Sequence, residues 1–550
     1  MAEYGKPDDD QMDRRHFLQR SAVAASTGIL GRMSAYGHTA EELQVEPFEL
    51  DETTISSLRG DFESGRLTSR AITELYLGRI EKIDKQGPAV NAIIELNPDA
   101  LSIADACDAA MKEKKSKGPL HGIPVLIKDN IATLDKMQTT AGSMALEGAR
   151  SKRDSMVARR LRQAGAVILG KTNLSEWANF RSEHSTSGWS GRGKQTHNPY
   201  SLDRNPSGSS SGSGAAVAAN MAVIAVGTET DGSITSPSSC NCLVGIKPTV
   251  GLVSRSGIIP ISHTQDTAGP MARTVMDAAI LLGVLAGVDS ADPVTNQSRG
   301  KSHSDYTKYL IADGLRGARI GVARKFFGFS ESVDKLMAEC LTSMKAHGAT
   351  LIDPADIPNA DKYGAAEFDV MLYEFKADLN HYLAELGPDA PIQTLKDLIA
   401  FNIHHADREM PFFGQDLLIK AQGKGPLTSK AYLAALAKCR RYSRAEGIDE
   451  VMQKHRLDAI VAPTGGPPWT TDPVNGDHFS GGCTSPPAVA GYPHITVPAG
   501  FIYGLPVGIS FIGTAYSEPT LLKLAYAFEQ ATKHRKSPRF LATVELSNAR

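Results

Sequence analysis

Short apolar runs alternate with amphipathic stretches along most of the chain. Runs rich in Val, Ile and Ala are typical of strands that are buried on both faces. They predict strands at 125–127, 166–169, 222–226, 320–322, 460–462, 495–497 and 507–511. Helical periodicity lies between them at 154–163, at 215–221 and at 68–80, with Thr68 as the N-cap. Together these elements predict an α/β fold, with a β-sheet flanked by helices on both faces.

Residues 300–450 are more helical and more charged than the rest of the chain, for example at 374–386 and 431–448. We therefore expect a helical insert around 300–450, within a single domain over 38–550. No segment repeats at a fixed period, so a solenoid or propeller is not indicated.

The first 37 residues carry the features of an export signal. Arg14 and Arg15 precede a weakly apolar stretch at 21–30, and small residues end the segment at Gly37. This order resembles a bacterial twin-arginine signal, so we expect an exported protein, periplasmic or extracellular. The apolar stretch is shorter than the ~20 residues that span a bilayer, so no stable membrane insertion is expected.

Composition and charge narrow the functional classes. Of 550 residues, 41% are hydrophobic and 22% are charged, which excludes a polytopic membrane protein or a wholly disordered chain. The formal net charge is −2, so no basic excess indicates nucleic-acid binding. Among six scattered cysteines, Cys240 and Cys242 form the one close pair, which is a weak metal signal without a second pair. We expect neither a metal nor a cofactor; whether two cysteines form a disulfide stays open.

One glycine motif is misleading. Residues 165–172, GAVILGKT, fit the pattern of a phosphate-binding loop, G-x-x-x-x-G-K-[ST]. Such a loop follows a strand and opens a helix, whereas here the four middle residues are apolar and follow a helical segment. We interpret the segment as a buried strand rather than a nucleotide site.

A second glycine-rich segment, 206–237, joins PSGSSSGSG to GTETDGSITSP through an apolar helix and strand. A flexible linker would not run directly into such elements. Serines among glycines can instead bring hydroxyls and backbone N–H groups close to a ligand. The segment is therefore a candidate functional site.

This segment resembles the signature of the amidase signature family of serine hydrolases, approximately GGSSGGS…GTDTGGSIR. GPLHGIPVLIKDN (118–130) resembles the lysine motif of that family, and GKTN (170–173) its next segment. VGIKPTVGLVSRSG (244–257) and the C-terminal motifs within 485–513 are similar as well, so that the resemblance covers about residues 45–540. It implies the amidase signature fold, with a central, mostly mixed β-sheet, and an amidase that hydrolyses linear amide C–N bonds.

The resemblance also implies the roles of individual residues. Lys128 aligns with the catalytic lysine, Ser209 with the serine that the family holds on a cis peptide, and Ser233 with the nucleophile. Ser210 is expected as a supporting hydrogen-bond donor. The oxyanion hole would be formed by the backbone N–H groups of Thr230, Asp231, Gly232 and Ser233.

A lysine can act as the base only when its pKa lies far below the usual value of about 10.4. Burial without a carboxylate partner disfavours the charged form and can lower the pKa towards ~7–8. The apolar residues before Lys128 favour such a site, and Asp129 should point to the opposite face of the strand. Neutral Lys128 would accept a proton from Ser209 while Ser209 accepts one from Ser233, which attacks the amide carbonyl.

Five positions depart from the family pattern, and none of them removes a catalytic hydroxyl. Ser207 and Ser211 replace glycines, Glu229 replaces Asp, Asp231 replaces Gly, and Thr235 replaces Arg. The gained carboxylate and the lost cation bear on substrate preference. The TETDGSIT version, together with the segments IIPISHTQDTAGPMAR and MLYEFKADLNHYL, is most similar to bacterial peptide amidases, which deamidate peptide C-terminal amides.

The expected substrate is therefore a small-molecule or peptide amide, hydrolysed to acid and ammonia, and the resemblance favours a peptide C-terminal amide. Aryl, acyl or fatty acid amides are the alternative substrates. A role as part of a tRNA-dependent amidotransferase is a less favoured alternative, because it needs partner subunits and a cytoplasmic location. A monomer or a homodimer is expected.

Overall fold

The computed structural model describes residues 45–546, and the predicted export signal at 1–37 lies outside them. The central sheet contains the strands β1 (Ile93–Leu96), β2 (Pro124–Lys128), β3 (Val167–Thr172), β6 (Ile224–Glu229), β7 (Val244–Lys247), β8 (Thr267–Ala272), β9 (Arg319–Val322), β10 (Thr350–Ile352), β11 (Ala459–Pro463), β12 (His494–Ile502) and β13 (Leu505–Ile512). Their order is β1-β3-β2-β6-β8-β7-β12-β13-β11-β9-β10. β2 lies parallel to β3 and β6, whereas β8 is antiparallel to β6. The predicted α/β fold with a mixed sheet is confirmed.

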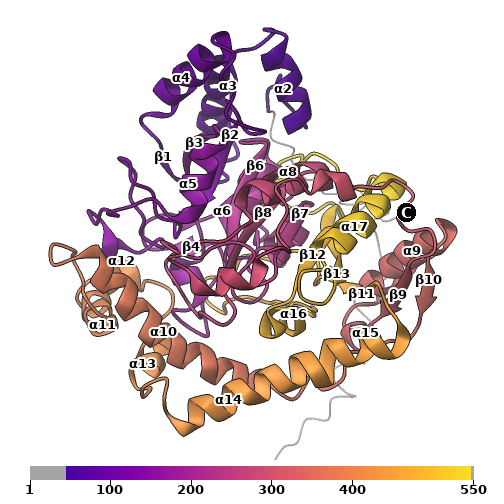
Figure 1. Cartoon of the computed structure of the whole chain (residues 1–550). Coiled ribbons are helices and arrows are strands. Elements are labelled where there is room, and N and C mark those ends of the chain that lie inside the picture. Colours follow the sequence, from indigo (N-terminus) through magenta and orange to yellow (C-terminus); the bar gives the residue numbers. More distant parts are fainter. Residues whose placement is uncertain (1–44, 547–550) are drawn as a thin grey trace, which may run out of the picture. The chain divides into compact units, whose positions relative to one another are not determined.

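Helices pack around this sheet (Figure 1). They are α2 (Ile55–Glu63), α3 (Ser69–Ile80), α4 (Ala100–Lys112), α5 (Met156–Gln163), α6 (Ser211–Ala218), α7 (Thr235–Cys240), α8 (Val275–Leu285), α9 (Glu331–Ala346), α10 (Gly364–Leu386), α11 (Leu395–His404), α12 (Ala406–Glu409), α13 (Asp416–Gln422), α14 (Lys430–Arg440), α15 (Asp449–His455), α16 (Ser485–Ala490) and α17 (Glu518–Thr532). A two-stranded ribbon, β4 (Trp189–Ser190) with β5 (Lys194–Gln195), stands apart from the main sheet. The predicted cap of α3 is present, because the Thr68 side chain accepts a hydrogen bond from the Ala71 N–H.

The strands predicted from apolar runs all occur, because their side chains fill the core between sheet and helices. Val125, Val167 and Ile224 have no exposed surface. Lys171, the lysine of the misleading glycine motif, lies within β3. It is fully buried, and its Nζ donates to the carbonyl of Ile131 at 2.6 Å. The motif is therefore a strand, as expected, and presents no open loop to a phosphate.

Helix α6 begins earlier than its sequence suggests. The apolar pattern predicts a helix at 215–221, whereas the helix starts at Ser211, inside the Ser/Gly run. Small residues are needed here because the helix packs closely against neighbouring backbone. A Cβ at Gly212 would lie 2.2 Å from the carbonyl oxygen of Ala92. Close packing of the helix against neighbouring backbone outweighs the weak helix propensity of Ser and Gly.

The expected helical insert is shorter than 300–450. The first part of that range supplies β9 and β10 to the sheet, with helix α9 between them, and the succession of helices α10 to α14 begins at Gly364. In Figure 1, α10 to α14 lie together outside the sheet, and α10 packs against α13 and α14. β9, which was predicted at 320–322, pairs in parallel with β10, which was not predicted, and the two strands form one end of the sheet.

Two further expectations concern cysteines and membranes. All six cysteines are buried and none is in a disulfide. Among the described residues, no helix has both the length and the apolar character needed to cross a bilayer.

Candidate active site

Lys128 ends strand β2, which lies between β3 and β6 in the sheet, and has no exposed surface. Its Nζ donates to Ser209 Oγ at 2.7 Å, to Thr228 Oγ1 at 2.9 Å and to the Thr228 carbonyl at 3.3 Å. Thr228 comes from the neighbouring strand β6, and Asn130 Nδ2 donates to the same Thr228 hydroxyl at 3.0 Å. The amine therefore lies among hydroxyl and carbonyl oxygens, without a carboxylate in hydrogen-bond contact.

Burial lowers the pKa of Lys128 to about 7, although the charges of Asp266 and Glu229 oppose the shift. Asp129, the adjacent carboxylate, accepts hydrogen bonds from the N–H groups of Thr140 and Gly142 instead. An amine with this pKa is substantially neutral near pH 7 and can accept a proton.

Ser209 lies directly before helix α6, and its peptide bond with Gly208 is cis. The next residue, Ser210, donates from Oγ to the Thr228 carbonyl at 3.0 Å and accepts from the Thr228 N–H at 3.1 Å. Its N–H donates to the Ser233 carbonyl at 3.1 Å. Ser210 thus ties the Ser/Gly segment both to β6 and to the loop that carries Ser233.

The loop at 230–233 joins β6 to α7. Glu229 shapes it, because one carboxylate oxygen accepts from the N–H groups of Ile234 at 2.8 Å and Thr235 at 2.9 Å. Gly232 adopts a φ of 79°, which favours glycine. Among the described residues, none of the four N–H groups of 230–233 donates to a protein acceptor. These donors are available to a ligand oxygen.

Ser233 differs from Lys128 and Ser209 in its access to solvent. It retains 8% of its surface, whereas Lys128 and Ser209 retain none. Within the described part of the chain, the hydroxyls of Ser209 and Ser233 form no hydrogen bond with each other. The structure therefore brings Lys128 and Ser209 into contact and joins Ser233 to them through backbone.

A cavity of about 200 Å³ opens beside this cluster. Thr228 and Thr230 line it on the side of β6, and Ile258, Ile259, Ile261 and Tyr382 give it apolar walls. The Thr230 hydroxyl donates to Asp266 at 2.6 Å, and burial raises the pKa of Asp266 to about 6. The cavity thus combines apolar walls with a polar edge next to Thr228.

Comparison with known proteins places the chain in a family. A family model described as Amidase matches residues 71–522. The chain belongs to the amidase family. The resemblance to amidase signature enzymes is thereby confirmed, and the chain is an amidase hydrolase.

Three relatives illustrate the range of this family. The structure of native peptide amidase from Stenotrophomonas maltophilia has a TM-score of 0.86 and 50% identity, and the match covers 90% of this amidase and 100% of that chain. A probable amidase from Arabidopsis thaliana is 44% identical over 504 residues, 90% of this chain and 93% of the relative. A putative amidase from Arthroderma benhamiae is 39% identical over 510 residues, 88% of this chain and 83% of the relative.

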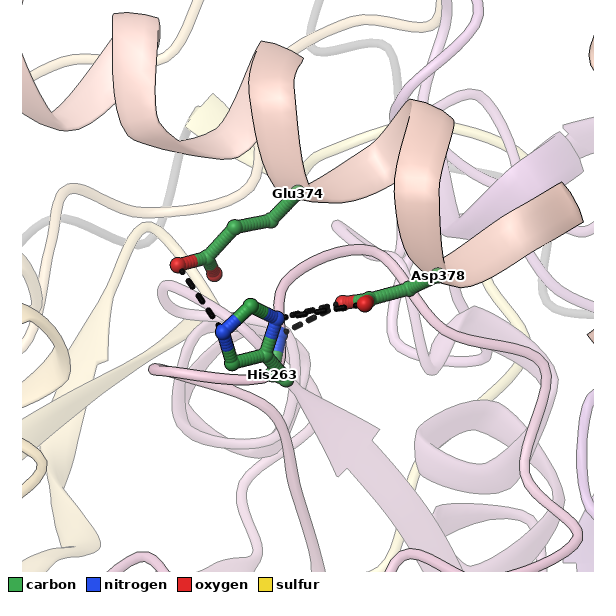
Figure 2. Close-up of side chains that lie close together, drawn as sticks. All are labelled: His263, Glu374 and Asp378. Carbon is green, nitrogen blue, oxygen red and sulfur yellow. Dashed lines mark hydrogen bonds and ion pairs between the residues drawn. The ribbon is translucent and has the colours of Figure 1, made fainter. Parts of the chain in front are cut away.

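A charged cluster of the amidase fixes helix α10 to the wall of the cavity. Figure 2 shows His263 between Glu374 and Asp378 of α10. His263 Nδ1 lies 2.9 Å from an Asp378 oxygen, and Nε2 lies 3.4 Å from a Glu374 oxygen. Burial opposes the charged form, but the Asp378 hydrogen bond and the Glu374 charge together raise the pKa of His263.

The same three side chains have the donor types of a metal site. Glu374, however, already accepts hydrogen bonds from Tyr432 at 2.6 Å and from the Thr264 hydroxyl at 2.9 Å. With its oxygens occupied in this way, the cluster is satisfied as a hydrogen-bonded ion network. We therefore describe it as the α10 clamp, formed by His263, Glu374 and Asp378.

Several residues of the site were not predicted from the sequence. Thr228 and Asn130 lie inside recognised motifs, and their polar side chains at the ends of buried strands were an available signal. His263 lies within one of the segments similar to peptide amidases, but a single histidine in a loop does not identify its partners. The partners of Lys128 and His263 are brought together by the sheet and by α10, over long sequence distances.

Proposed function

We propose that this amidase hydrolyses the C-terminal amides of peptides, with Ser233 as nucleophile, Ser209 as relay and Lys128 as base. The observation that carries the proposal is the 2.7 Å hydrogen bond between Lys128 Nζ and Ser209 Oγ, made by an amine with no exposed surface. Because burial lowers the pKa of Lys128 to about 7, its neutral form is available as a proton acceptor.

In this reaction Lys128 takes the proton of Ser209 while Ser209 takes the proton of Ser233. The Ser233 oxygen forms a bond to the amide carbon, and the carbonyl oxygen becomes an oxyanion. Catalytic hydrogen bonds commonly shorten only in the complex with substrate, so the contact between the two serines is assigned to that complex.

The unoccupied N–H groups of 230–233 are suited to bind the oxyanion, since donors directed at developing charge accelerate acyl transfer. The relay then runs in reverse and delivers the proton to the leaving nitrogen, which departs as ammonia. Water attacks the acyl-enzyme by the same route and releases the acid and free Ser233.

Two observations support a peptide amide as the substrate. One is the 50% identity to a solved peptide amidase over the full length of that chain. The other is the adjoining cavity, whose charged rim residues already have partners: Arg255 is paired with Asp292, and His263 with Asp378. An uncharged carboxamide attached to a peptide would meet apolar walls and paired charges there, and would leave no charge of its own unpaired.

The test is ammonia release by the purified protein from a panel of peptide C-terminal amides, aryl amides and fatty acid amides. We expect peptide amides to have the highest kcat/KM and Ser233→Ala to reduce turnover on the order of 10⁴-fold or more. Higher activity on aryl or fatty acid amides would contradict the substrate class. Full activity of Ser233→Ala would contradict the assigned nucleophile.

Export is a separate proposal, supported by the order of Arg14, Arg15 and the apolar stretch at 21–30. A fusion of residues 1–37 to a reporter tests it, with Arg14→Lys combined with Arg15→Lys as the control. We expect secretion that the double substitution abolishes. A reporter retained in the cytoplasm in both forms would contradict export.

A further inference from the structure

The loop at 230–233 meets helix α10 through two carboxyl groups. Glu367 of α10 lies beside Asp231, and the two carboxyl groups interact as like charges at close range. Glu367 has only 6% of its surface exposed, so water screens the pair weakly. Two touching carboxylates at this depth do not both ionise, and one of them holds a proton.

Hydrogen bonds to neighbouring side chains fix both carboxyl groups. Ser485 Oγ donates to Asp231 Oδ2 at 2.6 Å, and Gln265 Nε2 donates to Glu367 Oε1 at 3.0 Å. The same Gln265 nitrogen lies 3.4 Å from the Thr230 carbonyl. The contact therefore joins the loop at 230–233 to α10 at two points, the carboxyl pair and Gln265.

The surrounding charges indicate which carboxyl holds the proton. The titratable groups that face the pair are Tyr363 of α10, Cys439 of α14, Glu229 of β6, Lys247 of β7 and Cys483 ahead of α16. The cation among them, Lys247, interacts with Asp231. Burial and the Asp231 charge raise the pKa of Glu367 well above its usual value.

We propose that Glu367 is a positioning residue of this amidase: its protonated carboxyl donates to the Asp231 carboxylate and holds the loop at 230–233 against α10. The proposal rests on the proposed function, since that loop carries Ser233 and the oxyanion donors. Groups of this kind have to be held within about 0.5 Å of the productive geometry, which a loop alone does not provide.

Loss of the Glu367 proton has two consequences for catalysis. The hydrogen bond becomes a repulsion between two carboxylates, which separates the loop from α10. A second negative charge also faces the place where the oxyanion develops and opposes its formation. At lower pH, kcat/KM should rise with pH as Lys128 becomes neutral. At higher pH, kcat/KM should fall again as the pH rises through the raised pKa of Glu367.

The test is the pH dependence of kcat/KM from neutral to alkaline pH for the full chain and its variants. Glu367→Gln keeps a donor to Asp231 but has no proton to lose, so it should remain active and lose the alkaline decline. Glu367→Ala removes the contact and should reduce kcat on the order of 10²-fold, as expected for a misplaced catalytic group. A change in kcat with little change in KM distinguishes positioning from loss of binding.

Glu529→Gln is the matched control. Glu529 is a second buried carboxyl, whose pKa burial raises to about 7, but it lies in α17 and accepts from the Val275 N–H at 2.7 Å. We expect this variant to keep the alkaline decline. If Glu367→Ala does not fold, Asp231→Asn provides the second measurement, since it removes the like charge and should also abolish the decline.

Each result bears on the proposal. An alkaline decline that disappears in Glu367→Gln and persists in Glu529→Gln supports it. A parent enzyme without an alkaline decline, or a Glu367→Gln variant that keeps it, overturns it. If Ser233→Ala is inactive in the same assay, such a failure leaves the proposed function intact; if Ser233→Ala is active, the proposed function itself fails.

Discussion

Two polar clusters border the same cavity and shift the pKa of a basic side chain in opposite directions. The base cluster, Lys128 with Ser209 and Thr228, borders it through Thr228, and the α10 clamp borders it through His263 and Asp378. In the base cluster the amine has only hydroxyl and carbonyl partners, whereas in the clamp the imidazole lies between two carboxylates.

The pKa shifts follow from these environments. Burial dominates at Lys128 and lowers its pKa to about 7. At His263 burial is outweighed by Asp378 and Glu374, which raise the pKa. The structure therefore favours the neutral form of the amine, which proton transfer requires, and the charged form of the imidazole, which holds α10. One fold obtains both results by controlling which groups have a carboxylate neighbour.

Among substitutions in these two clusters, removal of the base is expected to give the largest effect. Lys128→Met keeps a long apolar side chain in the buried position but removes the proton acceptor. We expect kcat/KM to fall by ~10²–10⁴-fold, the usual contribution of a general base. In the parent, kcat/KM should decline as pH falls below about 7, because Lys128 becomes protonated.

The measurements are pH–rate profiles of parent and variant, together with thermal unfolding. Because methionine needs no buried charge, the variant should unfold at a temperature no lower than the parent. An unfolded variant would make its rate uninformative, and the parent profile alone would then decide. A parent rate that stays constant far below pH 7 contradicts Lys128 as the base.

Motifs predicted the base cluster better than the clamp. Lys128 and Ser209 lie at the ends of strongly patterned segments, and the apolar runs around them predict the buried strands that bring them together. His263 and Glu367 have no such signal. Each acquires its role from a partner on another element, so local pattern cannot identify it.

The fold shows a similar division. Apolar runs predicted β2, β3 and β6, since strands buried on both faces have nearly continuous apolar sequences. They did not predict β8, the other neighbour of β6. The start of α6 at Ser211 was missed, because close packing around Gly212 overrides the propensity of its Ser/Gly residues. The helical insert was predicted too long, because its first part, which includes the predicted strand β9 and the unpredicted strand β10, belongs to the sheet.

A matched pair of glycine substitutions compares the packing around α6, which is tight, with the packing at the start of α10, which is open. In Gly212→Ala the new Cβ would lie 2.2 Å from the Ala92 oxygen, so we expect a loss of about 1–3 kcal/mol or more in the free energy of unfolding. In Gly364→Ala the new Cβ meets no atom within 4 Å, and helix propensity favours alanine by roughly 0.5–1 kcal/mol.

Chemical denaturation of both variants and the parent gives these differences. A destabilised Gly364→Ala would contradict the open environment described for the start of α10. A Gly212→Ala variant as stable as the parent would contradict the tight contact between α6 and the backbone at Ala92.

The smallest expected effect concerns the clamp. His263→Gln removes the cation between Glu374 and Asp378 while keeping a side chain able to donate a hydrogen bond. We expect KM for peptide amides to rise a few-fold with little change in kcat, because the clamp shapes the cavity and does not contact the reacting atoms. His347→Gln, at an exposed histidine that follows α9, is the control and should leave both constants unchanged.

The pH dependence of stability provides the sharper test of the clamp. The folded pKa of His263 is raised, so its stabilising contribution is complete below the unfolded pKa and is lost as pH rises through the folded pKa. The stability difference between parent and His263→Gln should therefore be largest below the unfolded pKa of about 6.5 and should decrease as the pH rises above it. A difference that stays constant over this range would mean that His263 holds α10 through neutral hydrogen bonds, and the contrast in charge between clamp and base cluster would not hold.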